Sequence, residues 1–417
     1  MLRLAIVVSH PIQYYVPLYR RLAARSDLEI KVFFTWHGGG GDVYDQGFQR
    51  PIAWDIPLTD GYQSGVVPNT ARDPGTHHFR GLQNPELVGW VKGWNPDAVH
   101  LTGYSYASHL TLMRAMARTG IPLLFRGDSH LLDERAGLKS FLKRILLRKV
   151  FSWPSAFLFV GRNNRAYYES FGVPEEKLSY CPHSIEVSRF SEPSFELERR
   201  ATEWRRELKI PEETVVGLFA GKFETKKRPI ELMKWFLDAS GERSVLVMAG
   251  SGEHEAELKR LAASAPERFR VLPFQNQSLM PVLYRVGDFL ILPSAFGETW
   301  GLAVNEAQAC GRPVLVSDRV GCAPEMVIPG QTGEIFTSAN SPRRSRLPQR
   351  ATRLEGVDNG GAERGIHPSF SSALNRIVEQ LRSGAYSRER ILNHARQFDI
   401  SETVSALMNC LRAVVER

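Results

Sequence analysis

The sequence predicts an α/β protein with two doubly wound domains that face each other across a cleft. Short apolar strands alternate with amphipathic helices through residues 1–190, and the same alternation restarts near residue 211. Strands interleaved with helices indicate a parallel sheet that is covered on both faces. The chain has 417 residues, which suffice for two domains that each bury a core.

The first domain is predicted over residues 1–190, where apolar runs alternate with helical patterns. The expected strands are 2–8, 29–35, 98–103, 122–127 and 156–161. The expected helices are 15–25, 106–119 and 138–151. Helix 138–151 has five cations, no acids and interleaved apolar residues, so it could lie on an anionic membrane. An ordinary domain helix is the favoured interpretation, because its charges do not gather on one face.

The charged segment 191–210 is predicted to be a linker, and the second domain to span 211–399. The expected strands are 214–221, 244–250, 270–274, 288–293 and 313–318. The expected helices are 229–239, 255–263, 301–311 and 371–384, and a last helix at 401–417 follows this domain. Residues 338–369 are rich in Arg, Ser, Gly and Pro, which indicates a flexible insertion. Its five arginines between 343 and 353 leave a contact patch as the weaker alternative.

Charge and cysteine usage narrow the partners and the compartment. The formal charge is +8, and residues 1–190 carry 22 Lys and Arg against 16 Asp and Glu, an excess of six. This excess suits anionic lipid, phosphorylated small molecules or nucleic acid, and nucleic acid ranks last because no basic–aromatic motif appears. The four cysteines form no Cys-x-x-Cys pair and indicate a reducing compartment. We expect a cytoplasmic protein, since the first apolar run is too short for a signal peptide, with peripheral membrane contact as an option.

The most informative stretch is "PSAFGETWGLAVNEAQACGRPVLVSD", residues 293–318, which holds two glutamates. A helix should begin near Gly301 and end at Gly311. Glu306 then lies on an apolar face of that helix, among Leu302, Ala303, Ala309 and Cys310, with Asn305 and Gln308 on other sides. A carboxylate accepts two hydrogen bonds at once, which suits the vicinal hydroxyls of a ribose. The alternative for Glu306 is a structural carboxylate bonded to backbone or to a buried arginine.

Two further features of this region suit phosphate groups. The backbone of Trp300, Gly301 and Leu302 would form a helix N-terminus, where unpaired N–H groups attract anions. In "FAGKFETKKRPIELM", residues 219–233, Lys222 and Lys227 follow a strand and precede a helix. Two cations there suit a diphosphate whose negative charge grows as it leaves. A solvated basic loop is the alternative.

The stretch "FGETWGLAVNEAQACGRPVLVSDRVGCAPEMV" with the later "GQTGEIF" resembles the signature of family 4 glycosyltransferases. That signature is Glu, seven residues, Glu, then a Gly-x-Pro-Val strand and a Gly-rich turn. The resemblance implies the GT-B fold, with two Rossmann-like domains and retention of anomeric configuration. It also implies that the last helix, within about 400–417, crosses back to the N-terminal domain.

The resemblance assigns donor-binding roles in the second domain. Glu306 would hold the ribose, Glu298 the donor sugar, and the amides of 300–302 the phosphates or sugar hydroxyls. Lys222 and Lys227 match a Gly-Arg-x-x-x-x-Lys loop, with Lys222 in place of the more usual Arg. "MAGSGEHEAEL", with Gly250, resembles a Gly-rich turn, and by resemblance the backbone near Phe274 and Gln275 contacts the nucleobase.

The N-terminal domain departs from the family pattern. His10 and Gln13 stand in the loop after the first strand, where many members have a Gly-rich loop, and would face a phosphate or the acceptor. Many relatives also have a His-Asp pair in the region of "LLFRGDSHLLDE", residues 123–134, and Gly127 aligns with that His. The candidate polar groups are Asp128, Arg126 and His130. Together with Glu298 and Lys227, Asp128 is the predicted catalytic set.

The resulting prediction is a retaining transferase that moves a hexose from a UDP- or GDP-linked donor to a glycan or lipid-linked acceptor, as in polysaccharide or glycolipid assembly. No Asp-x-Asp motif occurs, so neither a metal nor another cofactor is expected. Front-face attack would let the leaving phosphate oxygen take the acceptor proton, and domain closure would exclude water. The alternatives are another GT-B enzyme, such as a nucleotide-sugar epimerase, and a non-catalytic binding protein.

Overall fold

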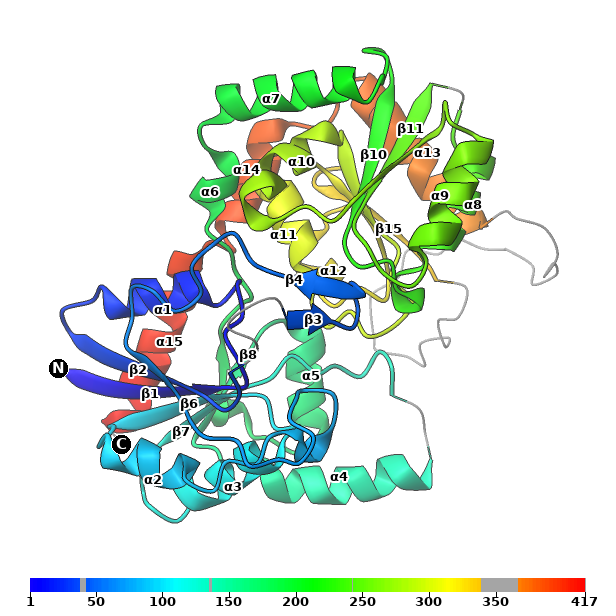
Figure 1. The fold of residues 1–417 in the computed structure, drawn as a ribbon. Helices are drawn as coiled ribbons and strands as arrows, with labels where there is room; N and C mark the ends of the chain where they lie inside the picture. Colours follow the sequence, from blue (N-terminus) through cyan, green and yellow to red (C-terminus); the bar gives the residue numbers. More distant parts are fainter. Residues whose placement is uncertain (38–42, 135–136, 242, 339–366, 417) are drawn as a thin grey trace.

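The computed structural model describes residues 1–37, 43–134, 137–241, 243–338 and 367–416. It consists of two α/β halves stacked one above the other, each built on a parallel sheet with helices on both faces (Figure 1). The predicted fold class is therefore confirmed, and the predicted alternation of strands and helices is present in both halves. Most of the predicted insertion 338–369 lies outside the described residues.

The N-terminal sheet has seven parallel strands in the order β5-β2-β1-β6-β7-β8-β9. In that order the strands are Ser64–Val66, Leu28–Phe34, Leu2–Val8, Ala98–Thr102, Leu123–Arg126, Ala156–Phe159 and Leu178–Tyr180. Its helices are α1 (Val16–Ala23), α2 (Leu87–Gly93), α3 (Ala107–Met116), α4 (Leu138–Val150) and α5 (Arg162–Ser170). A separate antiparallel hairpin joins β3 (Val43–Asp45) to β4 (Arg50–Ile52).

The C-terminal sheet has six parallel strands in the order β12-β11-β10-β13-β14-β15. In that order the strands are Phe269–Leu272, Ser244–Ala249, Val215–Ala220, Phe289–Leu292, Val314–Ser317 and Gly333–Phe336. Its main helices are α7 (Ser194–Glu207), α8 (Pro229–Ala239), α9 (Glu255–Ser264), α10 (Met280–Val286), α11 (Leu302–Ala309), α12 (Ala323–Met326), α13 (Pro368–Arg382) and α14 (Arg388–Arg396).

Each sheet buries both faces, which explains why its strands are continuous apolar runs. In β1, Ile6 belongs to a core under α1, while Val7 on the opposite face belongs to a core under α2 and α3. In β10, Leu218 and Phe219 divide in the same way between the two cores of the C-terminal half. All four cysteines, Cys181, Cys310, Cys322 and Cys410, are buried in these cores.

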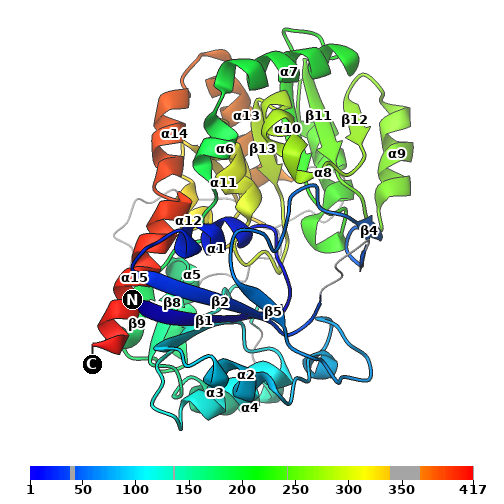
Figure 2. The same ribbon diagram turned by 60° about the vertical axis from the view of Figure 1, so that its left-hand side comes forward.

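The chain passes between the halves twice, at neighbouring places. The backbone of Ile185 pairs with the segment around Asp399, since its N–H donates to Phe398 and its carbonyl accepts from Ile400. After this return, α15 (Ile400–Val415) packs on the N-terminal sheet, where Leu407 and Leu411 are buried beside Leu4 and Ile6 (Figure 2). The C-terminal helix is thus part of the N-terminal core.

The segment 191–210 forms the helix α7 and packs on the C-terminal half rather than lying free as a linker. Ala201 is buried in the core of that half, and Trp204 packs against the same core. Arg205 forms an ion pair of 2.7 Å with Asp288, just before β13. The sequence predicted only a charged linker here, because partners such as Asp288 lie about 80 residues away.

Candidate active site

The order of strands in each sheet reverses at one point, and the predicted motifs lie beside it. In the C-terminal sheet, β10 has β11 on one side and β13 on the other. Ligands of open α/β sheets bind outside the carboxyl ends of the strands at such a reversal. The loops that follow β10 and β13 carry Lys222, Lys227 and Glu298, so the fold brings these motifs to one edge.

Lys227 and Glu298 form an ion pair at this edge. The Lys227 Nζ lies 2.6 Å from the Glu298 Oε2, and the hydroxyl of Ser294 donates to the same oxygen at 3.0 Å. Burial opposes ionisation of Glu298, but Lys227 and Ser294 outweigh it and hold the pKa of that carboxyl below its usual value. A charged glutamate and a charged lysine therefore stand together in a mostly buried position.

A second loop holds the backbone around Glu298 in place. The N–H of Gly321 donates to the Glu298 carbonyl at 2.9 Å, and the N–H of Cys322 donates to the Trp300 carbonyl at 2.9 Å. A Cβ at position 321 would lie 1.8 Å from the Thr299 carbonyl oxygen, so only glycine permits this approach. The Gly-rich turn noted in the sequence thus supports the entrance of α11, where Gly301 is the N-terminal cap.

Glu306 has a tyrosine as its hydrogen-bond partner. The buried Tyr284 hydroxyl donates to the Glu306 Oε2 at 2.5 Å. Burial raises the pKa of Glu306, and the bond from Tyr284 and the charge of Arg189 oppose the rise. The partner is neither backbone nor a buried arginine, the two structural alternatives considered from the sequence.

Asn305 and Gln308 are buried, although the helical pattern predicted them on other sides of α11 from the apolar face. Asn305 accepts a hydrogen bond from the Trp300 Nε1 at 2.9 Å. Gln308 donates to the carbonyl oxygens of Met326 and Thr332. The helix α11 is therefore enclosed on several sides, and the Asn305 oxygen and the Gln308 nitrogen bond to partners that the sequence of the helix does not reveal.

Lys222 is engaged by the N-terminal half. Its Nζ lies 2.7 Å from the Asp45 Oδ1 and 3.0 Å from Oδ2, and 4.9 Å from the centre of the Phe48 ring. Asp45 ends β3, 177 positions earlier in the chain. Neither Asp45 nor Phe48 was predicted from the sequence to reach the site.

The remaining donor-side candidates lie in the loops after β11 and β12. Gly250 directly follows β11, and its neighbour Ser251 donates to the Phe48 carbonyl at 3.0 Å. Phe274 and Gln275 follow β12 and are partly exposed. The Phe274 ring contacts the Phe48 ring at 4.8 Å between centres, so side chains of the N-terminal half also reach the predicted nucleobase position.

From the N-terminal half, Asp128 and Asp133 reach the loop that carries Glu298. The Thr299 hydroxyl donates to the Asp128 Oδ2 at 2.8 Å. Asp133 accepts from the Gly297 N–H at 2.7 Å and pairs with Arg319 at 2.7 Å. The structure thereby brings Asp128 to Thr299, the residue that follows Glu298, and adds Asp133 to the contacts, while the catalytic role of Asp128 stays a prediction.

The other N-terminal candidates are placed differently. Arg126 is buried and donates to the carbonyls of Cys181 and Pro182, so it holds a loop inside its own domain. His130 is buried and accepts from the N–H of Leu132. Burial lowers the pKa of His10 to about 4, although nearby Asp45 opposes this, so His10 is neutral at pH 7. Gln13 precedes α1 and is partly exposed.

His183 is a residue that the sequence did not single out. It is buried behind the site, 4.0 Å from the Asp128 Oδ2 and with its ring 5.6 Å from that of Trp300. Burial and the charge of Arg126 keep its pKa well below the usual value, so the imidazole is neutral. The one signal in the sequence was its position just after a strand. That strand, β9, has only three residues and gives no clear pattern, so the signal was missed.

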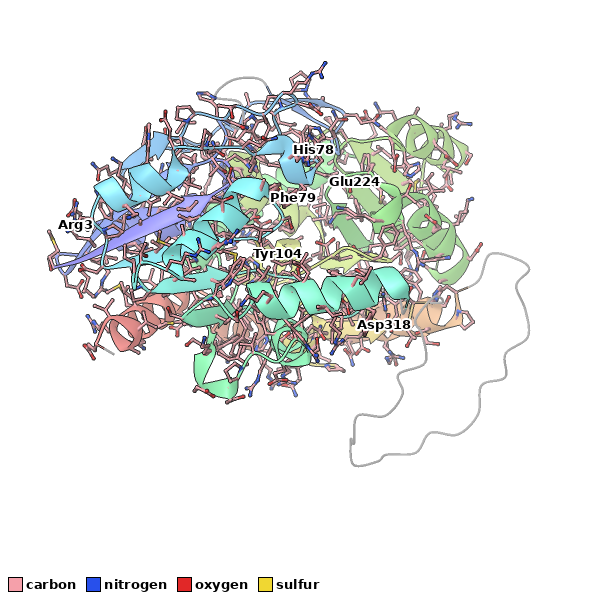
Figure 3. The ribbon with its side chains drawn as sticks, turned by 90° about the horizontal axis from the view of Figure 1, so that it is seen from below. Arg3, His78, Phe79, Tyr104, Glu224 and Asp318 are labelled. Atoms are coloured by element: carbon pink, nitrogen blue, oxygen red, sulfur yellow. The ribbon has the colours of Figure 1, made fainter. Side chains whose placement is uncertain are left out.

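Among the described residues, one group could offer three metal ligands. Asp73, His77 and His78 have ligand atoms within 4.8 Å of one another. They belong to the loop before the short helix at Phe79–Gly81, and Figure 3 marks His78 in this region. None of the predicted site residues belongs to this group. Metal-independent transfer stays a prediction.

Comparisons with known proteins identify the family of the chain. Residues 200–345 match the family described as glycosyl transferases group 1, and residues 55–189 match glycosyltransferase family 4. A D-inositol 3-phosphate glycosyltransferase of Salinispora arenicola is 32% identical over 337 residues, which cover 73% of this chain and 70% of that protein. 

Solved structures share the fold at low identity. The Anabaena protein Alr3699/HepE in complex with UDP and glucose aligns with a TM-score of 0.67 and 15% identity, over 99% of this chain and all of that one. The lipopolysaccharide outer core galactosyltransferase WaaB aligns with a TM-score of 0.65 and 14% identity, over 99% of both chains.

Proposed function

The chain belongs to glycosyltransferase family 4, and on that basis we propose that it moves a hexose from a nucleoside diphosphate sugar to an acceptor hydroxyl with retention of configuration. The Lys227–Glu298 pair beside the N-terminus of α11 carries this proposal. Together, the ion pair and the helix N-terminus offer a cation, a carboxylate and backbone N–H groups at the strand edge where a sugar diphosphate would bind.

Each group meets one demand of the reaction. Departure of a diphosphate from the anomeric carbon leaves negative charge, which Lys227 and the amides of Gly301 and Leu302 would stabilise. Glu298 would orient the hexose through its hydroxyls and would not attack the anomeric carbon. The acceptor proton would pass to the leaving phosphate oxygen as the acceptor bonds to the same face, which retains the configuration. 

Glu306 would bind the ribose. Its Oε2 already accepts from Tyr284, which fixes the orientation of the carboxylate. The other oxygen, together with the remaining lone pairs, can accept bonds from adjacent ribose hydroxyls. UDP is the nucleotide to test first, because the similar Anabaena structure contains UDP and glucose.

No divalent metal is proposed for the diphosphate. The sequence has no Asp-x-Asp motif, and the cations next to Glu298 are lysines. The proposal predicts that turnover is unchanged by EDTA and is not increased by added Mg²⁺ or Mn²⁺. Loss of turnover in EDTA, restored by either ion, would reject this part of the mechanism.

We further propose a lipid-linked or other anionic acceptor at a membrane surface. The helix α4 exposes four large apolar side chains, whose exposed fractions are Phe141 59%, Leu142 58%, Ile145 55% and Leu146 60%. Seen from below, α4 lies on the outside of the N-terminal half (Figure 3). The buried Leu147 and Val150 anchor its opposite face.

Charge favours an anionic bilayer as the surface that α4 meets. Lys143, Arg144, Arg148 and Lys149 stand among or beside the apolar side chains, and α4 contains no acidic residue. Apolar side chains that enter the interface while cations contact lipid phosphates are typical of peripheral helices. Asp128 and Asp133 shortly precede α4 in the sequence, so a membrane-bound acceptor would be held near the site. No helix among the described residues is long and apolar enough to span a bilayer.

Sedimentation with vesicles tests the membrane proposal. Phosphatidylglycerol vesicles should bind the wild-type protein more strongly than phosphatidylcholine vesicles, and added salt should weaken the binding. The double variant Phe141→Ser/Ile145→Ser should lose binding, whereas Phe195→Ser, at a position on α7 that is even more exposed, should not. Equal binding by all three proteins would reject α4 as the contact.

Product analysis tests the transferase proposal itself. The purified protein with UDP- and GDP-hexoses and an acceptor extract should release nucleoside diphosphate and form an α-linked glycoside from an α-linked donor. A β-linked product would reject retention. A rearranged but intact nucleotide sugar would instead indicate an epimerase, and no consumption of any donor by a folded sample would indicate a binding protein.

A further inference from the structure

A strap from the N-terminal half lies across the donor side of the C-terminal half. We define it as residues 45–55, which contain the turn after β3, the strand β4 and the three residues that follow. Figures 1 and 2 show the hairpin apart from its own sheet, next to the C-terminal half. It contacts the loops that follow β10, β11 and β12.

The first contact is electrostatic. Asp45 binds Lys222 through both carboxylate oxygens, at 2.7 and 3.0 Å, and the N–H groups of Gly47 and Phe48 donate to Asp45 at 2.8 and 2.9 Å. The turn therefore fixes the carboxylate in the orientation that meets Lys222. Since Lys227 pairs with Glu298, a carboxylate neutralises each of the two lysines assigned to the diphosphate.

The second contact is steric. A Cβ at Gly47 would lie 2.0 Å from the Glu224 Oε1 and 2.6 Å from the Lys222 Cδ. A Cβ at Gly252 would lie 2.9 Å from the Gly47 carbonyl oxygen. The tip of the strap thus packs closely against the side chains of Lys222 and Glu224 and against the turn after β11.

The third contact covers the predicted nucleobase position. The centre of the Phe274 ring lies 4.8 Å from that of Phe48 and 6.0 Å from that of Trp54. The Arg50 guanidinium lies 5.7 Å from the centre of the Phe274 ring. Further along, Asn276 donates to the Ala53 carbonyl at 2.7 Å, and Ser278 bonds to the Asp55 carboxylate. 

We propose that the strap is an internal occupant of the donor site, in which the Asp45 carboxylate holds Lys222 until the diphosphate of a donor replaces it. The lysine keeps an anionic partner in both states, so it is never left charged and unpaired. Asp45 cannot stay beside the incoming diphosphate, because like charges at contact distance repel strongly in a partly buried site. Donor binding therefore releases the tip of the strap from the C-terminal half and couples the donor site to the acceptor-side domain.

This inference rests on the proposed donor site and adds a residue that lowers donor affinity. Substituting Asp45→Asn removes the competing charge and keeps the size of the side chain. UDP and GDP titrated calorimetrically into this variant should bind about fivefold or more tightly than into wild type. Asp60→Asn, an exposed carboxylate of the same domain outside the strap, controls for the change in net charge and should leave the affinity unchanged.

Hydrogen exchange gives a readout that does not depend on activity. Saturating UDP or GDP should increase amide exchange in peptides from residues 45–55 of the wild type, while exchange in the loop that carries Lys222 should fall. In Asp45→Asn the strap peptides should exchange faster than wild type even without nucleotide. Unchanged or slower exchange of the strap on nucleotide binding would overturn the proposal.

A third variant separates this inference from the proposed function. Lys222→Met should weaken nucleotide binding if Lys222 contacts the diphosphate. If Lys222→Met weakens binding but Asp45→Asn weakens it too, Asp45 orients the lysine and the strap proposal fails alone. If Lys222→Met has no effect, or no variant binds either nucleotide, the donor-site assignment of Lys222 fails and the strap proposal with it.

Discussion

The Lys227 Nζ lies 2.6 Å from the Glu298 Oε2, and this pair joins the loop after β10 to the loop after β13. Two motifs about 70 residues apart in the sequence thereby meet at the reversal point of the C-terminal sheet. In the proposed reaction Lys227 stabilises the leaving diphosphate and Glu298 orients the sugar. Because the two side chains bind each other, loss of one should also disturb the other.

Lys227→Met should lower kcat by about 100-fold or more, in line with the loss of one charge-stabilising donor from an active site. Its loss also leaves Glu298 mostly buried without its cation. The matched control is Lys226→Met, because Lys226 is adjacent and pairs with Glu224 at 3.0 Å instead. Initial rates of nucleotide release measure both. Equal losses in the two variants would mean that the loop needs positive charge in general and not Lys227 in particular.

Asp128 and Thr299 should act as one unit across the two halves, because the Thr299 hydroxyl donates to the Asp128 Oδ2 at 2.8 Å. Asp128→Asn and Thr299→Val should each reduce kcat/KM. The double variant should lose less than the sum, with a coupling energy of about 1 kcal/mol or more. Additive losses would show that this contact does not contribute to the reaction.

His109 should make the stability of the protein depend on pH. Its imidazole is buried between Gly103 and Thr35, and burial lowers its pKa to about 4. The unfolded chain, with a pKa near 6.5, binds more protons between these values, so the free energy of unfolding rises with pH there. From about pH 5 to pH 7 this one group contributes a rise of roughly 2 kcal/mol.

Urea unfolding at several pH values measures that dependence. His109→Gln should reduce the slope of unfolding free energy against pH in this range, whatever its effect on stability at pH 7. An unchanged slope in the variant would show that other groups produce the pH dependence.

The helix α15 should be essential for the stability of the N-terminal half. Leu411 is fully buried in the core that also contains Ile6, and it follows the second crossing of the chain. Leu411→Ala should lower the free energy of unfolding by about 2–5 kcal/mol. Ala413→Ser, an exposed position of the same helix, should change it by less than about 0.5 kcal/mol. Equal stability of both variants in thermal unfolding would contradict the packing of α15 described above.

The sequence predicts local structure and the family motifs well, because both depend on neighbouring residues. The apolar runs of β1 and β10 and the Gly that ends α11 are visible without partners. The crossing back of the last helix was expected only from the family resemblance, and the structure places α15 on the N-terminal sheet.

Contacts between distant segments could not be predicted in this way. The strap reaches Lys222 from 177 positions away, and the strands β3 and β4 of its hairpin are three residues long, too short for a periodic signal. Helical periodicity placed Gln308 away from the apolar face of α11, yet it is buried and donates to the carbonyls of Met326 and Thr332. Arg126 was a candidate for contact with a phosphate or the acceptor, but its guanidinium donates to backbone carbonyls of its own domain.

In the proposed donor complex, Glu306 binds the ribose of a nucleotide whose diphosphate contacts Lys222 and Lys227. The most direct measurement is calorimetric titration of wild type, Glu306→Gln and Tyr284→Phe with UDP and with inorganic pyrophosphate. We predict that Glu306→Gln binds UDP about tenfold or more weakly, since hydrogen bonds to a charged group are lost, and that Tyr284→Phe has a smaller effect. Pyrophosphate should bind all three proteins equally. Unchanged UDP affinity in Glu306→Gln, or equal losses for UDP and pyrophosphate, would contradict the account.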